Sequence, residues 1–199
     1  MKKIILSAVA IFAFGVASAQ LREKGTIEII SQIGASTSIY NGGDANRIDY
    51  NYSSLSGFSF GVGADYFFND RWSMRSGLLY QPMGSKINSV KVTEKIDYLT
   101  LPVNANWHFG STRKWNLNFG PSFGFLLSAD GNGIDLKDRA NEIQVGFNYG
   151  IGYKIEITNQ ISILIDFQGM TGLSDIAKDA DTTIKNSYSS FNVGGVFKL

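Results

Sequence analysis

The segment Asn192-Val193-Gly194-Gly195-Val196-Phe197-Lys198-Leu199 is the most informative stretch of this sequence. Together with the residues before it, it alternates with a period of two, as a strand does. One face carries Phe191, Val193, Gly195, Phe197 and Leu199, and the other carries Tyr188, Ser190, Asn192, Gly194, Val196 and Lys198. We therefore expect a strand over 187–199 with one apolar face, reaching the carboxyl terminus.

The first nineteen residues have the pattern of a secretory signal peptide. Lys2 and Lys3 form a positive region, Ile4–Val16 is an apolar run of 13 residues, and Ala17-Ser18-Ala19 supplies the small residues that a signal peptidase accepts. The alternative is a membrane-anchoring helix, which needs about 20 apolar residues. We expect cleavage after Ala19, which leaves residues 20–199 as one exported domain, and no lipid anchor because no cysteine follows.

Composition excludes several classes of protein. Without Lys2 and Lys3, 16 basic residues face 17 acidic ones, a formal charge of −1, so nothing indicates a nucleic-acid partner. The sequence has no cysteine, so disulfides and thiolate metal sites are excluded. Its 22 glycines and 3 prolines favour closely packed strands.

Alternation at period two recurs from about residue 26 to the end, whereas no window after Gln20 shows a convincing helical period. The clearest strand has Ile143, Val145, Phe147 and Tyr149 on one face. The predicted strands are 26–39, 55–68, 72–84, 94–109, 115–129, 141–157, 161–173 and 187–199. Pro102 falls within one of them and removes a ladder hydrogen bond, so we expect a bulge there.

Strand length and connection length both indicate a membrane barrel. The strands exceed the usual 5 to 6 residues or so and meet the roughly 9 to 11 that a tilted transmembrane strand needs. Short connections at 69–71, 110–114 and 158–160 alternate with long polar ones at 41–54, 85–93, 129–140 and 174–186. Outer-membrane barrels have short periplasmic turns and longer extracellular loops. We therefore expect an all-β, eight-stranded antiparallel up-and-down transmembrane barrel.

Aromatic residues gather beside the short turns, as they do at bilayer interfaces. This predicted aromatic girdle consists of Tyr66, Phe68, Trp72, Trp107, Phe109, Trp115 and Phe197. A soluble barrel of the lipocalin type would instead turn its apolar face inward. Glycines such as Gly61, Gly120 and Gly150 lie on the polar face, where a narrow lumen leaves little room, so the membrane barrel is favoured.

Charged residues on the polar face predict a filled lumen. The predicted lumen charge network consists of Glu28, Asp65, Arg75, Lys154, Glu156, Asp166 and Lys198. An eight-stranded barrel is just wide enough for side chains to fill it. If Phe68 and Trp72 pair across the first short turn, Asp65 lies opposite Arg75, close enough to bond. We expect this pair to anchor a plug of paired charges, with neutral Ser36, Thr100, Ser122, Asn148 and Gln168 above the charges.

Three segments carry a resemblance to known families. The terminal pattern of 192–199 resembles the strand by which bacterial outer-membrane barrels are recognised for assembly, which implies the barrel-assembly machinery and outer-membrane lipid as partners. Asp97-Tyr98-Leu99-Thr100-Leu101-Pro102-Val103 and the glycine-rich stretch 57–68 resemble motifs of the outer-membrane β-barrel family of Bacteroidota that includes PorT-like proteins. PorT is associated with protein secretion, but no residue here singles out that role.

Residues that could perform chemistry are few. His108 is the only histidine, and it is expected inside the barrel beside a short turn, at the wrong end for a base acting on outer-leaflet lipid. The acidic stretches 130–135 and 175–181 could ligate calcium through oxygen, but they lack the full ligand spacing. We expect no catalytic residue, no metal site and no cofactor.

The sequence thus predicts an integral outer-membrane barrel with a structural or interaction role, which presents its long loops to the exterior or to a protein partner. The alternatives are a narrow solute channel and, less favoured, a lipid-modifying enzyme. Loop side chains that could contact a partner are Tyr40, Arg47, Tyr50, Tyr52, Lys86, Lys91, Lys137, Arg139, Lys178 and Lys185.

Overall fold

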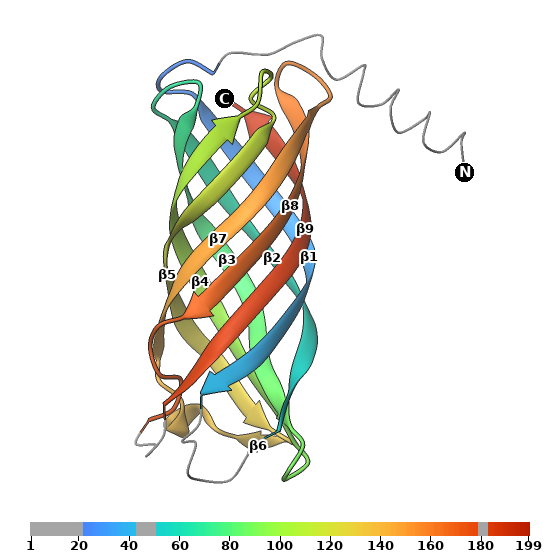
Figure 1. Cartoon of the computed structure of the whole chain (residues 1–199), viewed down its shortest axis with the longest axis vertical. Helices are drawn as coiled ribbons and strands as arrows, with labels where there is room; N and C mark the ends of the chain where they lie inside the picture. Colours follow the sequence, from blue (N-terminus) through green and yellow to red (C-terminus); the bar gives the residue numbers. More distant parts are fainter. Residues whose placement is uncertain (1–21, 43–50, 179–182) are drawn as a thin grey trace, which may run out of the picture.

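Eight long antiparallel strands form a closed barrel, which confirms the predicted fold class (Figure 1). The structure is a computed structural model that describes residues 22–42, 51–178 and 183–199. The predicted signal peptide, its cleavage site, Arg47 and Tyr50 lie outside these residues. The barrel strands are β1 (Ile27–Gly42), β2 (Tyr52–Phe67), β3 (Trp72–Ile87), β4 (Val92–Phe109), β5 (Trp115–Gly131), β7 (Ile143–Glu156), β8 (Ile161–Gly172) and β9 (Ile184–Lys198). Each strand pairs with its neighbour in sequence, and β1 pairs with β9 to close the sheet.

The two ends of the barrel differ. The turn end, at the top of Figure 1, carries the connections 68–71, 110–114 and 157–160, and the chain terminus at Leu199. The loop end, at the bottom, carries the connections 43–51, 88–91, 132–142 and 173–183. The third of these holds a two-residue strand, β6 (Ile134–Asp135), and a 3₁₀ turn, η1 (Lys137–Arg139), which the alternation pattern did not predict.

Side-chain caps make the short turns tight. Asn69 Oδ1 accepts hydrogen bonds from the backbone N–H of Arg71 at 2.8 Å and of Trp72 at 2.9 Å. Thr158 Oγ1 does the same for the N–H groups of Gln160 and Ile161. Such local bonds are the reason that Asn and Thr favour turns.

Several strands reach farther toward the loop end than the alternation predicts. β1 ends at Gly42 rather than at 39, and β9 begins at Ile184 rather than at 187. Gly42 and Ile184 are partners in the β1–β9 ladder. Backbone hydrogen bonds continue where the side-chain pattern has already turned polar, so apolar alternation underestimates strand length.

The predicted bulge at Pro102 is wrong. Pairing of β4 with both neighbours keeps one register through Pro102, and Ser76 Oγ donates a hydrogen bond to its carbonyl at 2.8 Å. The ladder lacks some bonds there without gaining an extra residue. The register shifts instead lie between Asp97 and Tyr98 of β4, against β5, and between Ser54 and Phe60 of β2, against β3.

The barrel is apolar outside, and its charged side chains are buried inside, the reverse of a soluble protein. Phe58 is 72% exposed and Ile33 is 62% exposed on the outer face, whereas Asp65 and Lys154 are fully buried in the lumen. No helix in the described ranges is long and apolar enough to cross a membrane.

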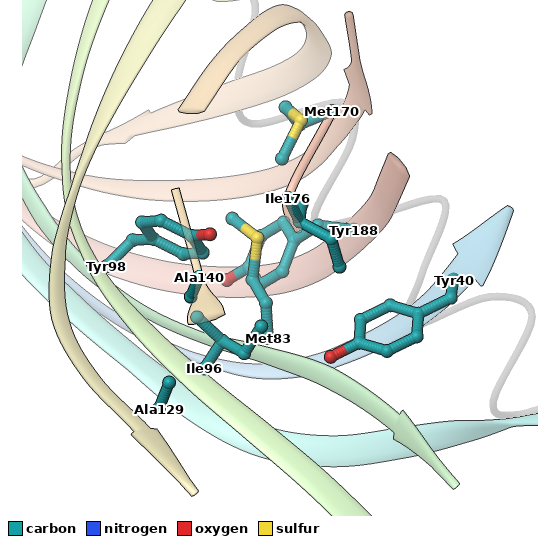
Figure 2. Close-up of a cluster of buried hydrophobic side chains, with 9 residues drawn as sticks. All are labelled: Tyr40, Met83, Ile96, Tyr98, Ala129, Ala140, Met170, Ile176 and Tyr188. Carbon is teal, nitrogen blue, oxygen red and sulfur yellow. The ribbon is translucent and has the colours of Figure 1, made fainter. Parts of the chain in front are cut away.

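The half of the lumen nearer the loop end contains an apolar cluster that the sequence did not predict (Figure 2). We call it the loop-half cluster, and its members are Tyr40, Met83, Ile96, Tyr98, Ala129, Ala140, Met170, Ile176 and Tyr188. Ala140 and Ile176 belong to long connections, so two loops fold into the mouth of the barrel. The prediction that Tyr40 is an exposed contact point is wrong, because it lies in β1, points inward and is only 2% exposed.

Candidate functional site

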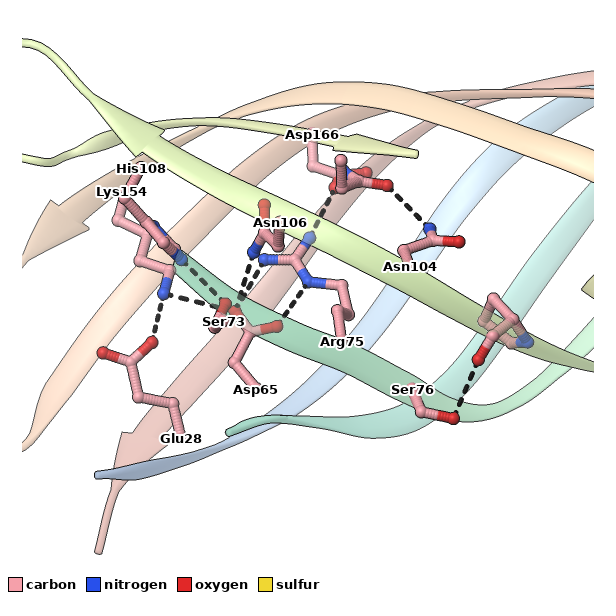
Figure 3. A network of polar contacts seen from close by, with 12 residues as sticks. Glu28, Asp65, Ser73, Arg75, Ser76, Asn104, Asn106, His108, Lys154 and Asp166 are labelled. Atoms are coloured by element: carbon pink, nitrogen blue, oxygen red, sulfur yellow. Dashed lines mark hydrogen bonds and ion pairs between the residues drawn. The ribbon is translucent and has the colours of Figure 1, made fainter. Parts of the chain in front are cut away.

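Arg75 forms the centre of the charged network in the half of the lumen nearer the turn end (Figure 3). Its Nε and Nη2 donate to the two carboxylate oxygens of Asp65, both at 2.9 Å, and its Nη1 donates to Asp166 Oδ2 at 3.3 Å. The residue partners Asp65 and Arg75 confirm the register predicted from the first short turn. The guanidinium therefore bridges β2, β3 and β8 by a bidentate and a single contact.

Lys154 extends the network toward the turn end. Its Nζ bonds Glu28, and it lies 3.6 Å from Asp65 Oδ2. Arg22 Nε donates to Glu28 Oε1 at 2.5 Å, and Arg22 Nη2 lies 3.9 Å from Glu156. Glu156 is also 3.4 Å from Lys114 Nζ.

These contacts define a charge cluster of four cations and four anions: Arg22, Arg75, Lys114 and Lys154 with Glu28, Asp65, Glu156 and Asp166. Its formal charge is zero when all eight groups are ionised. Burying ions costs several kcal/mol each unless they are paired and hydrogen-bonded. The balance of charge is therefore a condition for filling the lumen in this way.

Neutral amides donate hydrogen bonds to the two buried aspartates. Asn106 Nδ2 donates to Asp65 at 3.2 Å, Asn192 Nδ2 donates to Asp166 at 3.0 Å, and Gln168 Nε2 donates to Asp166 at 2.6 Å. Together with Arg75, they give Asp65 and Asp166 several donors each, whereas Glu156 Oε1 has no hydrogen-bond donor in the described chain. These two aspartates therefore have little capacity left to bind a mobile cation.

Sequence reasoning and structure differ on three members. Lys198 was predicted to join the network, but it is half-exposed, and among the described residues no ion pair of Lys198 is found. Arg22 and Lys114 were missed because they lie outside the strands, one before β1 and one in the turn 110–114. Both are buried, and a long cation beside a strand end is the signal that could have indicated them.

An aromatic ladder surrounds the turn end on the outer face. Ring centroids are 6.3 Å apart for Trp72 and Trp107, 5.0 Å for Trp107 and Phe109, and 6.2 Å for Phe109 and Trp115. The ladder continues to Tyr153, which the prediction omitted. The other predicted girdle residues, Tyr66, Phe68 and Phe197, are also exposed on the outer face.

His108 is buried in the lumen, where its Nε2 lies 2.9 Å from Ser73 Oγ. Its ring also packs against Phe67, with centroids 4.7 Å apart and the two ring planes tilted by 33°. A serine beside a histidine suggests a nucleophile and its base. However, Ser73 is only 1% exposed, and His108 Nδ1 has no hydrogen-bonding partner in the described chain that could orient the ring. No substrate can reach this pair while the barrel is closed.

The acidic loop 130–135 uses its oxygens locally. Asp130 Oδ1 accepts from Gly133 N at 3.0 Å, and Asp135 Oδ1 accepts from Lys137 N at 2.9 Å. Within residues 22–42, 51–178 and 183–199, no three His, Cys, Asp or Glu side chains are placed to hold a metal ion together. Part of the second acidic stretch, 179–181, lies outside the described residues.

The sequence and the fold both match known outer-membrane barrels. A family described as "Outer membrane protein beta-barrel domain" matches residues 5–197. The fold is similar to that of the outer membrane protein OprG from Pseudomonas aeruginosa, with a TM-score of 0.57 and 13% identity, covering 89% of this chain and 97% of that one. It is also similar to neisserial surface protein A, with a TM-score of 0.54 and 15% identity, covering 86% and 97%. No curated protein matches the sequence.

Proposed function

Because this chain belongs to the outer membrane protein β-barrel domain family, we propose that it is a non-conducting outer-membrane barrel with a structural or interaction role, exercised through its loop end. The observation that carries the proposal is that the lumen is filled at two levels. The charge cluster fills the half nearer the turn end, and the loop-half cluster fills the other half. With the interior filled, the loops are the part of the protein that remains available to a partner.

The channel alternative has little room between these two levels. A mid-lumen cavity of about 40 Å³ is lined by polar residues that include Gln81, Asn104 and Asn148. Since a buried water needs at least about 10 to 15 Å³, this volume accommodates only a few waters. Its lining includes Arg75 of the charge cluster and Met170 and Tyr188 of the loop-half cluster, which supports a closed lumen rather than a pore.

The enzyme alternative would require an accessible catalytic group. The candidate pair, Ser73 and His108, is buried in the turn half. We propose that His108 is a packing residue of the lumen and that the protein carries out no catalysis.

Planar-bilayer recording tests the closed lumen. The purified barrel, with insertion verified by heat-modifiable gel mobility, should give no stable unitary current above the lipid baseline. The single variants Met83→Ala and Met170→Ala remove part of the loop-half cluster. They should also give no current, because the charge cluster still fills the other half of the lumen. Stable, large currents through the wild-type protein would favour the channel instead.

We propose that the loop end faces the exterior and that the turn end, with the aromatic ladder, lies at the periplasmic interface. Short turns on the periplasmic side are typical of such barrels. The proposed partners are outer-membrane lipid, the barrel-assembly machinery during biogenesis, and a protein bound by the loops. Cross-linking in native membranes followed by purification of the barrel would identify that protein.

Two further proposals concern the first residue of the mature chain and its place among related barrels. The mature chain is proposed to begin at Gln20, which the mass of the purified protein tests directly. The segments 97–103 and 57–68 support a place among the PorT-like barrels of Bacteroidota. A role in protein secretion would require that deletion of the gene blocks export of a secreted protein.

A further inference from the structure

A pocket at the mouth of the loop end is lined in part by members of the loop-half cluster. Its volume is about 180 Å³, and its lining includes Tyr40, Glu94, Ile96, Arg139, Ala140 and Ile176. An apolar cavity of about 150 Å³ is enough to bind a benzene ring. The pocket therefore has room for one ring-sized apolar group.

Hydrogen bonds between two loops hold the pocket open and in shape. Asn141 N donates to Ile176 O at 2.8 Å, Lys178 N donates to Arg139 O at 2.8 Å, and Ile176 N donates to Ile184 O at 2.9 Å. Asn141 Nδ2 adds bonds to the carbonyls of Asp175 and Ala177. A site with a wall fixed by backbone bonds loses little entropy when a ligand binds.

The polar groups of the pocket are few and specific. Tyr40 is 2% exposed, and it lines the pocket together with the half-buried Glu94. Figure 2 shows the Tyr40 hydroxyl directed from β1 toward Ile96 and Met83. The half-buried Glu94 carboxylate lies beside this hydroxyl, which is in position to donate a hydrogen bond to it. A carboxylate held beside a buried hydroxyl can accept a further, charge-assisted hydrogen bond from a cationic ligand.

The charges favour a cationic ligand. Glu94 is half-buried, where a charge is weakly screened, whereas Arg139 is exposed at the rim, where water screens it. The field inside the pocket is therefore dominated by the carboxylate. We propose that this pocket binds a small amine, with its ring-sized apolar body against Ile96, Ala140 and Ile176 and its ammonium group at Glu94 and the Tyr40 hydroxyl.

This inference rests on the proposed function, since it names a ligand class for the loop end. The two can fail separately. A barrel that conducts ions would overturn the closed lumen whatever it binds, whereas a closed barrel that takes up no amine would overturn the pocket alone.

The test measures binding of 2-phenylethylamine to the detergent-refolded mature protein, by isothermal titration calorimetry or ligand-observed NMR. Saturable binding to the wild type is expected. Ala177→Leu fills the pocket and should abolish that binding. Any signal that remains with this variant therefore comes from partition of the amine into detergent. Equal signals from the wild type and Ala177→Leu would overturn the proposal.

Charge substitutions test the orientation of the ligand. Glu94→Gln should weaken amine binding about tenfold or more, as loss of a charge-assisted bond predicts. Arg139→Gln should tighten it slightly, because it removes a like charge. The matched control is Glu142→Gln, which removes a carboxylate from the loop that carries Arg139. The Glu142 side chain is 79% exposed and pairs with Lys178. An unchanged affinity in Glu94→Gln, or equal binding of the anion phenylacetate, would overturn the assignment.

Discussion

Substitution of Arg75 by alanine should be among the most destabilising single changes in the lumen. It removes two hydrogen bonds to Asp65 and one to Asp166. Both carboxylates stay buried, with side-chain exposures of 0% and 1%. Lys154, 3.6 Å from Asp65, and neutral amides are the remaining donors near them. Stranding a buried charge in this way costs roughly 3 to 5 kcal/mol of unfolding free energy.

The double variant Asp65→Ala with Arg75→Ala should be more stable than the single Arg75→Ala variant. The cluster is neutral with all eight groups, carries −1 after loss of Arg75, and returns to zero when Asp65 is also removed. We expect the double variant to recover about 1 to 3 kcal/mol relative to Arg75→Ala, the usual coupling for residues in direct contact.

Equilibrium urea unfolding in lipid vesicles, followed by tryptophan fluorescence, measures these differences. Trp72, Trp107 and Trp115 all lie on the outer face near the turn end and should report loss of the barrel. Arg113→Ala is the matched control, because Arg113 pairs with Asp70 at 3.1 Å outside the lumen and should cost no more than about 1 kcal/mol. If the effects of the two single substitutions simply add in the double variant, or if Arg75→Ala is as stable as the control, Asp65 and Arg75 are not coupled in a stabilising charge cluster.

Three further predictions concern the barrel as a whole. The mature protein should be heat-modifiable in detergent gels, because a closed sheet unfolds as one unit; recovery of a soluble monomer without detergent would contradict the membrane barrel. Gly120→Ala should lower the unfolding free energy of the barrel by about 1 to 3 kcal/mol, because the added Cβ would lie 2.9 Å from the Asn104 Cα. Gly195→Ala is the control, because the nearest atom to its added Cβ is 3.5 Å away; it should change the unfolding free energy by no more than about 0.5 kcal/mol in the same urea assay. Protease added to intact cells should cut near Lys137 or Lys178. If a reagent added from outside labels Asn69 but does not reach the long loops, the proposed orientation in the membrane is reversed.

Local pattern accounts for most of the fold. Alternation such as that from Ile143 to Glu156 is a property of neighbouring residues, so strand positions follow directly from the sequence. The three-residue connection after Phe68 also determines register, which is why the pairing of Asp65 with Arg75 was predictable. Pro102 shows the limit of the same reasoning, because a missing hydrogen bond was absorbed without a bulge.

Features that depend on distant segments were not predictable in this way. Arg22 and Lys114 belong to the charge cluster only because the closed barrel brings the segment before β1 and the second short turn beside Glu156. Tyr40 lies on the face of β1 that carries mostly polar residues, so alternation gave no reason to place it in an apolar cluster.

The amino-acid sequence by itself determined the strands, their outward face and the alternation of short and long connections, because each is set by residues within one strand or turn. The tertiary structure alone decided which inward residues meet, namely the loop-half cluster, the full charge cluster and the pocket beside Glu94. Side chains from different strands come to the same height only when the sheet closes with its stagger, and that geometry is not encoded in any single segment.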